Sequence, residues 1–305
     1  MRCAEAAPKS IANGLLLATL GSIAFSGKAI IVKLAYRHGV DAVTLIMLRM
    51  LFALPIFAVL AWWASRGKAP LTRKDWLGVL WLGFTGYYLA SFLDFAGLAY
   101  ISASLERLIL YLNPTLVLGL GLVLYQRPVK GVQIIGMAIS YCGVALVFGH
   151  EIGILGADAA WGALLVFLSA VSYAIYLVYS GELVKRLGAL RLVGLATTVA
   201  CLFCLLQFLI LRPLSAAMVA PEVIWLSVLN ATACTAVPVL LVMMAIERIG
   251  PGLVAQTGMI GPISTILMGV LILGEPFTRW VAAGTVLVIT GIFVFSRTSS
   301  IPRTR

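Results

Sequence analysis

Long apolar runs, separated by short polar stretches, follow one another along nearly the whole chain. The first run, Ile11 to Val32, exceeds the roughly 7–15 apolar residues of a signal-peptide core, so we expect it to remain as a helix. Nine further runs follow, and most are near the roughly 20 residues with which an α-helix crosses a bilayer. These predicted spans are 42–63, 76–95, 98–124, 130–149, 160–180, 192–211, 223–244, 251–273 and 278–296. The pattern predicts an all-α integral membrane protein with ten transmembrane helices.

The second half of the chain repeats the first. Six positions, Leu105, Pro114, Gly121, Pro128, Gly136 and Gly143, reappear 148 residues later as Leu253, Pro262, Gly269, Pro276, Gly284 and Gly291. An internal duplication explains this offset. We expect residues 1–150 and 151–305 each to form one repeat of five helices. Because five is odd, the two repeats cross the membrane in opposite directions, which makes an inverted repeat with an interface near the bilayer midplane.

Composition and charge agree with a membrane protein. Hydrophobic residues make up 62% of the 305 and charged residues 11%, whereas soluble domains carry roughly 25% charged residues. The net charge of +11 comes from Lys and Arg that lie mostly between the apolar runs, where they set orientation and do not indicate nucleic-acid binding. Most of them fall on the inner side if both termini are cytoplasmic. Since no targeting extension precedes the first helix, we expect a multi-pass protein of a bacterial inner membrane.

Short motifs at matched places in both halves point to one family. They are Tyr100-x-Ser-Ala-Ser104 leading to Pro114, Gly274-Glu275-Pro276, and the pair Gly284 and Gly291. Together with the duplicated five-helix halves, they make the chain similar to the EamA-type ten-helix members of the drug/metabolite transporter superfamily. The resemblance covers essentially the whole chain. It implies a secondary carrier that moves small organic solutes, often outward, and it implies no cofactor.

Five ionisable residues lie inside the predicted spans: Lys28, Arg49, Asp94, Glu106 and Arg107. Each such residue costs roughly 2.5–3.5 kcal/mol in a bilayer, so together they indicate either a polar pathway or a pairing network. We expect one cluster in the outer half of the first repeat, in which the two carboxylates neutralise two of the three cations. An ion network that locks helices together is one interpretation. In the other, Glu106 exchanges a proton during transport while the remaining cation orients an anionic group of the substrate.

The predicted helix 98–124 presents its polar residues on two neighbouring faces. Glu106 and Asn113 are seven residues apart and share one face, and Arg107 and Tyr111 are four apart and share the next. All four are therefore candidates for substrate binding or coupling.

Neutral groups complete the candidate set. Pro114 and Pro262 each free a carbonyl near the middle of the membrane, which either acts as a hinge or binds a solute. Other hydroxyl and amide side chains are expected to line a wet cavity between the halves, although a stripe of tyrosines also suits plain packing. These candidates are Tyr87, Tyr173, Tyr176 and Gln256.

The sequence favours a secondary active transporter that works by alternating access. Its expected substrate is a small amino-acid-like or drug-like metabolite, exported across the inner membrane with proton coupling or by exchange. A membrane scaffold or sensor, a channel and an intramembrane enzyme are the alternatives. An enzyme would need a nucleophile and base or a metal cluster; His38 and His150 are the only histidines and lie at span ends, so we expect neither catalysis nor a metal. The glycine faces of 130–149 and 278–296 suit either packing within a monomer or a homodimer.

Overall fold

The computed structural model describes residues 8–126, 131–258 and 260–298, and within these ranges it contains helices and no strands. The helices of the first half are α1 (Pro8–Tyr36), α2 (Ala42–Ser65), α3 (Arg73–Leu82), α4 (Ala90–Leu98), α5 (Ala103–Leu110), α6 (Asn113–Tyr125) and α7 (Gly131–Leu155). Those of the second half are α8 (Ala157–Leu187), α9 (Ala189–Leu211), α10 (Pro221–Ala231), α11 (Val237–Thr257), α12 (Ile260–Met268) and α13 (Arg279–Thr298). Four short stretches join or interrupt them: η1 (Gly83–Leu89), η3 (Thr232–Ala236) and η4 (Gly269–Leu273) are π-helical, and η2 (Leu214–Ala217) is a 3-10 helix.

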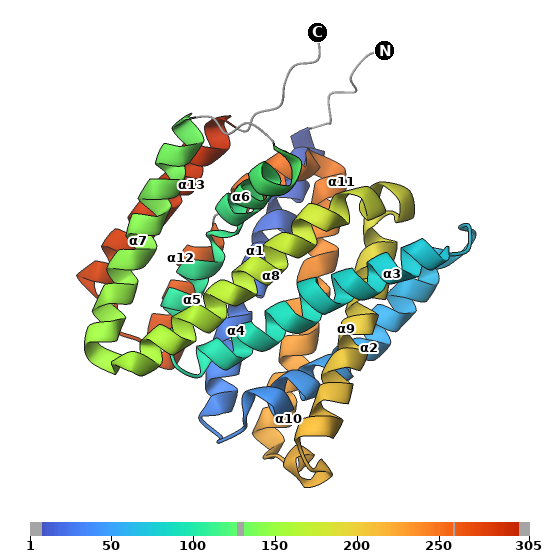
Figure 1. Ribbon diagram of the computed structural model, residues 1–305, viewed down its shortest axis with the longest axis horizontal. Helices are drawn as coiled ribbons and strands as arrows, with labels where there is room; N and C mark the ends of the chain where they lie inside the picture. The colour runs from blue at the N-terminus through green and yellow to red at the C-terminus, as the bar shows by residue number, and fades with distance from the viewer. Residues whose placement is uncertain (1–7, 127–130, 259, 299–305) are drawn as a thin grey trace.

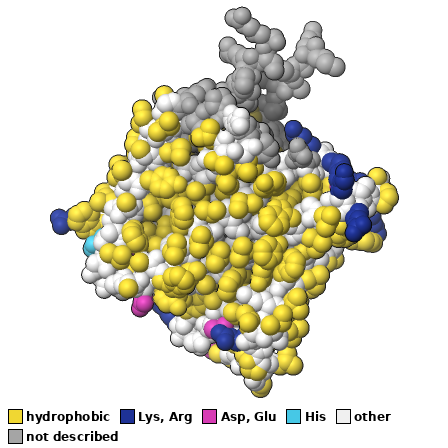
Figure 2. Space-filling model, viewed as in Figure 1, with side chains coloured by type: hydrophobic (Ala, Val, Ile, Leu, Met, Phe, Trp, Pro, Cys, Tyr) yellow, Lys and Arg dark blue, Asp and Glu magenta, His cyan; other side chains and the backbone are white. Residues whose placement is uncertain are grey.

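Within the described residues, eight helical segments are long and apolar enough to cross a membrane, and two shorter apolar helices, Ile260–Leu273 and Arg279–Val294, follow them. Hydrophobic side chains cover most of the face seen in Figure 2, and Lys and Arg lie at its edges. A soluble domain of this size would not expose such an area of apolar surface. The all-helical, multi-pass membrane character predicted from the sequence is therefore confirmed.

Two predicted helix boundaries are wrong. A break between the eighth and ninth spans was expected near 245–250, but α11 continues to Thr257 and α12 begins only at Ile260. A helix in a membrane tolerates a proline such as Pro251, because neighbouring groups can satisfy the carbonyl that the proline frees. Gln256 thus lies in the last turn of α11, and its side chain is outside the described part of the structure.

The fourth span begins five residues later than predicted, at Ala103, because the Ser102 side chain accepts a hydrogen bond from the Leu105 amide and caps α5. This span is also broken in two, between α5 and α6, and Pro114 lies in the first turn of α6. Pro262 likewise lies in the first turn of α12. Both prolines therefore begin a new helix, as the missing amide hydrogen of proline favours.

Asp41 fixes the start of α2. Its carboxylate accepts hydrogen bonds from the amides of Val43 and Thr44 and pairs with Arg212 at 3.3 Å. Burial alone would raise the pKa of Asp41, but the hydrogen bonds from Thr44 and Val43 and the charge of Arg212 hold that pKa below its usual value.

The helices pack mainly in pairs that join the two halves. In Figure 1, α7 lies beside α13 at one side of the molecule; α2 packs on α9, α1 on α11, and α4 on α8. Every one of these pairs combines a helix before residue 156 with one after it. The two halves are therefore interleaved and form one bundle.

Glycines allow α7 and α13 to approach closely. A Cβ atom on Gly284 would lie 2.7 Å from the carbonyl oxygen of Gly143, and one on Gly291 would lie 2.5 Å from that of Gly136. These four residues are the two glycine pairs of the duplicated motif. Small residues at such a contact are typical of helix packing in membranes. The two glycine faces thus contact each other within the monomer.

Replacing Gly284 by alanine should lower the thermal unfolding midpoint of the protein in detergent, because the new methyl group forces α13 away from α7. Gly149 on α7 provides a matched control, since a Cβ atom there would meet nothing within 4 Å. Gly149→Ala should leave the midpoint unchanged or raise it slightly, as alanine is the better helix former by about 1 kcal/mol. Equal midpoints for the two variants would contradict this account of the contact.

Candidate functional site

A cavity of about 570 Å³ lies inside the bundle, within the volume range of small-molecule sites. Residues of both halves line it, from α1, α2, η1, α4, α5, α8, η3 and α11 among others. Nine of the predicted site residues are among them: Lys28, Arg49, Tyr87, Asp94, Arg107, Tyr111, Asn113, Tyr173 and Tyr176. Glu106, Pro114 and Pro262 are not among the lining residues, and the side chain of Gln256 lies outside the described part of the structure.

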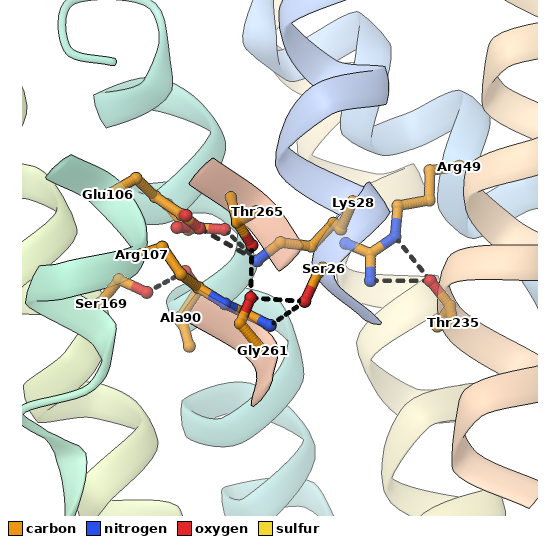
Figure 3. A network of polar contacts seen from close by, with 11 residues as sticks. Ser26, Lys28, Arg49, Ala90, Glu106, Arg107, Ser169, Thr235, Gly261 and Thr265 are labelled. Carbon is orange, nitrogen blue, oxygen red and sulfur yellow. Dashed lines mark hydrogen bonds and ion pairs between the residues drawn. The ribbon is translucent and has the colours of Figure 1, made fainter. Parts of the chain in front are cut away.

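Lys28 is held between two carboxylates. Its Nζ atom lies 2.5 Å from Asp94 Oδ2 and 3.5 Å from Glu106 Oε1, and Figure 3 shows its side chain directed toward Glu106. Asp94 is 2% exposed and Glu106 is fully buried. One lysine of α1 therefore connects α4 to α5 through ion pairs inside the apolar bundle.

The expected cluster thus exists in part, with a different pairing. The sequence predicted that the two carboxylates would neutralise two cations. In the described residues, both carboxylates instead lie within 4.0 Å of Lys28, and no ion pair within that distance reaches Arg49 or Arg107. Two acids share one lysine because Asp94 and Glu106 come from neighbouring helices on the same side of α1.

Arg107 contacts the second half of the chain. Its Nη2 atom donates to Ser26 Oγ at 3.0 Å, and Ser26 in turn donates to the carbonyl oxygen of Gly261 at 2.9 Å (Figure 3). The guanidinium lies 5.6 Å from the centre of the Tyr111 ring, as the four-residue spacing predicted. Tyr111 donates its hydroxyl to the carbonyl oxygen of Gly258 at 2.5 Å.

That last hydrogen bond explains how the second proline is tolerated. Pro262 has no amide hydrogen to donate to Gly258, four residues earlier, so the carbonyl of Gly258 needs another donor. Tyr111 supplies one, and the amide of Gly261 also donates to this carbonyl at 2.9 Å. The carbonyl freed near Pro262 therefore joins the two halves at the wall of the cavity.

Arg49 lies on the other side of Lys28 from Glu106 (Figure 3). It is 6% exposed, and its Nε and Nη2 atoms both donate to Thr235 Oγ1 at 3.2 Å. Its guanidinium carbon lies 5.2 Å from the centre of the Phe95 ring. The Nη1 atom is buried without a hydrogen-bond partner among the described residues.

Three tyrosines form one aromatic part of the cavity wall. The hydroxyls of Tyr87 and Tyr176 are 3.2 Å apart and their ring centres 5.2 Å, while the rings of Tyr173 and Tyr176 stack at 5.4 Å. These tyrosines therefore pack against one another and also line the cavity. The hydroxyls keep a polar edge at the cavity while the rings bury their apolar faces.

Sequence reasoning missed two π-helical stretches that shape the cavity. Gly86 and Tyr87 come from η1, and Cys234 and Thr235 come from η3. A π-helical turn inserts an extra residue into an α-helix and occurs often at functional sites. Thr235 donates its hydroxyl to the carbonyl of Asn230, five residues earlier, inside the widened turn. Nothing in the spacing of apolar residues indicated these turns.

Two carboxylates close the bundle where α5 begins. Glu275 accepts from the amides of Ala103, at 2.8 Å, and Ser104, at 3.3 Å, and from the Ser104 hydroxyl at 2.9 Å. Glu151 accepts from the amide of Ser102 at 3.1 Å and from its hydroxyl. Carboxylates are favoured at a helix N-terminus, where free amides and the helix dipole attract them. We call these five residues the carboxylate lock.

Comparison with known proteins decides the family. The model of the EamA-like transporter family matches residues 12–149 and again residues 160–297. The chain belongs to this family. The resemblance noted in the sequence is thereby confirmed, and the protein is a membrane transporter for small solutes.

Curated relatives of this EamA-like transporter are also named as transporters. It is 31% identical to the uncharacterized transporter YcbK of Bacillus subtilis over 88% of this chain and 87% of the relative, and 26% identical to YetK of the same organism over 81% and 76%. A solved crystal structure, described only as that of a protein, matches with a TM-score of 0.63 at 17% identity, covering 95% of this chain and 99% of the other. This last likeness concerns the fold alone.

Removing the shared cation of the EamA-like transporter should be costly. Lys28→Met leaves two buried carboxylates without an ion-pair partner, and breaking a buried pair in this way costs about 3–5 kcal/mol. We expect a marked fall in the thermal unfolding midpoint in detergent. Adding Asp94→Asn and Glu106→Gln to Lys28→Met should restore part of the loss.

Lys68 serves as the control for that series, because it is an exposed lysine whose amine donates only a long hydrogen bond, 3.5 Å, to the carbonyl of Leu187. Lys68→Met should barely move the midpoint. A Lys28→Met protein as stable as wild type would show that the three charges are not coupled.

Proposed function

We propose that this EamA-like transporter is a secondary active carrier that moves a small organic metabolite by alternating access through the central cavity. In this proposal ten segments cross the membrane as two inverted five-helix repeats, residues 1–150 and 151–305. The observation that carries the proposal is the cavity itself, because both halves line it and the charged cluster opens onto it. A site at the interface of two inverted repeats is the arrangement on which alternating access depends.

The packing pattern supports an inverted repeat. Exchanging the halves turns the contact of α1 with α11 into that of α4 with α8, and both are among the most extensive in the bundle. The contacts of α2 with α9 and of α7 with α13 are unchanged by the exchange, as expected for helices that pack next to a two-fold axis.

Two further features recur in both halves at about the same offset. The π-helical stretches η1 and η3 begin at Gly83 and Thr232, which are nearly one repeat length apart. The two matches to the family model, which begin at residues 12 and 160, are 148 residues apart, the same offset as the repeated motif. Each half therefore contributes a widened turn to the cavity from a corresponding helix.

The orientation in the proposal places both termini in the cytoplasm of a bacterial cell and directs net transport outward. The start of α1 and the end of α13 lie at the same end of the bundle (Figure 1). An even number of crossings requires this arrangement. We propose a monomer as the transporting unit, since the cavity is formed within one chain.

Proton coupling is proposed to reside in Glu106. Its two carboxylate oxygens are buried and accept no hydrogen bond from the described residues. The charges that act on it come from Asp94, Lys28 and Arg107. Two acids that share one lysine do not both need to stay ionised, so one proton can bind and leave without breaking the pair between Lys28 and Asp94.

Glu106→Gln should abolish solute uptake driven by a pH gradient in proteoliposomes, because glutamine cannot exchange a proton. Exchange of solute at equal pH on both sides should persist. Asp41→Asn is a suitable control, since Asp41 lies outside the spans and its carboxylate caps α2; uptake driven by the gradient should be kept. Uptake driven by a pH gradient in the Glu106→Gln variant would refute the role of Glu106 in proton coupling.

The carboxylate lock is proposed to hold a closed state at the end of the bundle where α5 begins. The corresponding residues of the second half cannot form it: 148 positions away, Glu275 is matched by Arg127 and Ala103 by Pro251, which has no amide hydrogen. The two ends of the bundle are thus chemically unequal. The lock is proposed to open when the carrier exposes its site on that side.

Glu275→Gln should favour the open state, because a neutral amide holds the α5 amides less strongly than a carboxylate does. Cys234 lines the cavity and is 6% exposed, so it can report access. In a variant with the other cysteines replaced by serine, Glu275→Gln should raise the rate of Cys234 alkylation by an impermeant maleimide about tenfold. The increase should occur only when the reagent is added on the side of the lock.

Glu222→Gln gives the control for labelling, since Glu222 is an exposed carboxylate at the start of α10. It should leave the rate of alkylation unchanged. A rate that is equally unchanged in Glu275→Gln would count against a gate at this end.

A further inference from the structure

Arg49 has no ion pair within 4.0 Å among the described residues, a property that it shares with Arg107. It lies on the cavity wall with 6% of its surface exposed. Its protein hydrogen bonds go to the single oxygen of Thr235, and its Nη1 atom has no partner among the described residues. Asp94, the carboxylate on the cavity wall, is already held by Lys28 at 2.5 Å. Burying a guanidinium in this state is costly unless a ligand anion completes it.

The charge balance of the cluster leads to the same residue. Lys28, Arg49 and Arg107 provide three positive charges, and Asp94 with Glu106 provides two negative ones, so one positive charge remains when all are ionised. Lys28 is the cation that pairs with both carboxylates. Arg107 follows Glu106 directly in the chain, whereas Arg49 lies on the other side of Lys28 from Glu106 (Figure 3). The remaining charge is therefore assigned to Arg49, the arginine farther from Glu106. A ligand of charge −1 would neutralise this positive charge. A zwitterion would leave the site with its net positive charge, and a phosphate ester of charge −2 would give it a net negative charge.

We propose that the transported solute is an organic monocarboxylate with an aromatic or apolar body, and that its carboxylate binds the guanidinium of Arg49 beside Thr235. This inference rests on the proposed carrier function. The guanidinium offers parallel N–H donors in a plane, which matches the two oxygens of a carboxylate. Thr235 would keep the guanidinium of Arg49 in position, and the Nη1 atom of Arg49 would gain a hydrogen-bond acceptor.

The rest of the cavity suits the body of such a solute. The rings of Tyr87, Tyr173 and Tyr176 supply an aromatic wall, and Phe57 adds an apolar side chain. An ammonium group on the solute would need a free carboxylate at the cavity. Asp94, the carboxylate on the wall, is paired with Lys28 through Oδ2, so its charge is already balanced; its Oδ1 atom has no hydrogen-bond partner among the described residues.

A series of four phenyl compounds tests the assignment: 3-phenylpropionate, phenylalanine, phenethylamine and 3-phenyl-1-propanol. They share an aromatic ring and differ in charge, as anion, zwitterion, cation and neutral alcohol. Binding to the purified protein in lipid nanodiscs is measured by calorimetry at several concentrations. We expect 3-phenylpropionate to bind most tightly and the cation not to bind.

Arg49→Gln should weaken binding of 3-phenylpropionate at least about 30-fold, since it removes a charged partner of a buried carboxylate. Its effect on the neutral alcohol should be less than about threefold. The affinity of Arg49→Lys for 3-phenylpropionate should lie between those of wild type and Arg49→Gln, because lysine keeps the positive charge but lacks the parallel N–H donors of the guanidinium. Arg191→Gln is the matched control: Arg191 is also 6% exposed, but it donates to Ser65 and to the carbonyl of Ala69, and it does not line the cavity. It should leave binding unchanged.

Thr235→Val covers the case in which Arg49→Gln does not fold. It removes the hydroxyl that holds Arg49 and keeps the charge, so it should weaken binding of the carboxylate severalfold and leave binding of the alcohol unchanged. Equal weakening for all four compounds, or tighter binding of phenylalanine or phenethylamine than of 3-phenylpropionate, would overturn the inference. Failure of 3-phenylpropionate to bind the folded wild-type protein would overturn it too. Counterflow of any other solute by the same preparation would show that the carrier function stands without it.

Discussion

Burial of charge in an apolar bundle is the constraint on which this structure depends. Lys28 forms ion pairs with two buried carboxylates, and it thereby connects α1 with α4 and α5. Apolar side chains make up most of the buried core, so these charged groups are not needed to fill it. Keeping five ionisable residues inside the bundle, four of them on the cavity wall, is costly. A cost of this kind is understandable where the charges act on a solute or a proton.

The cavity brings together two halves of different chemistry. The first half contributes all the charged residues, and the second contributes hydroxyls such as Thr235 and carbonyls such as that of Gly258. Arg107, Tyr111 and Arg49 each donate hydrogen bonds that end in the second half or pass through Ser26 to it. A change in the charge of the cluster would therefore alter hydrogen bonds at the interface between the two halves.

Much of the fold could be predicted from the sequence, because apolar run length and the 148-residue offset are both direct consequences of the membrane and of the duplication. The cluster of charges could also be predicted, since an ionisable residue in a bilayer requires partners. Its pairing could not, because Lys28, Asp94 and Glu106 come from three helices, and only the positions and rotations of those helices decide whether the lysine meets one carboxylate, both or neither. The continuation of α11 to Thr257 also escaped prediction, because Gly250 and Pro251 indicate a helix break in the sequence although a helix in a membrane can accommodate both residues. The π-helical turns have no sequence signal at all, although they place Tyr87 and Thr235 at the cavity.

Counterflow in proteoliposomes tests the central claim most directly. Vesicles loaded with a pooled panel of amino acids, organic carboxylates, related metabolites and cationic drugs are diluted into trace radiolabelled members of the panel. A carrier predicts transient accumulation of at least one labelled solute, absent from protein-free vesicles and abolished when that solute is omitted from the lumen. Labelled uptake no greater than in protein-free vesicles, for every member of the panel and from protein shown to be folded, would contradict it.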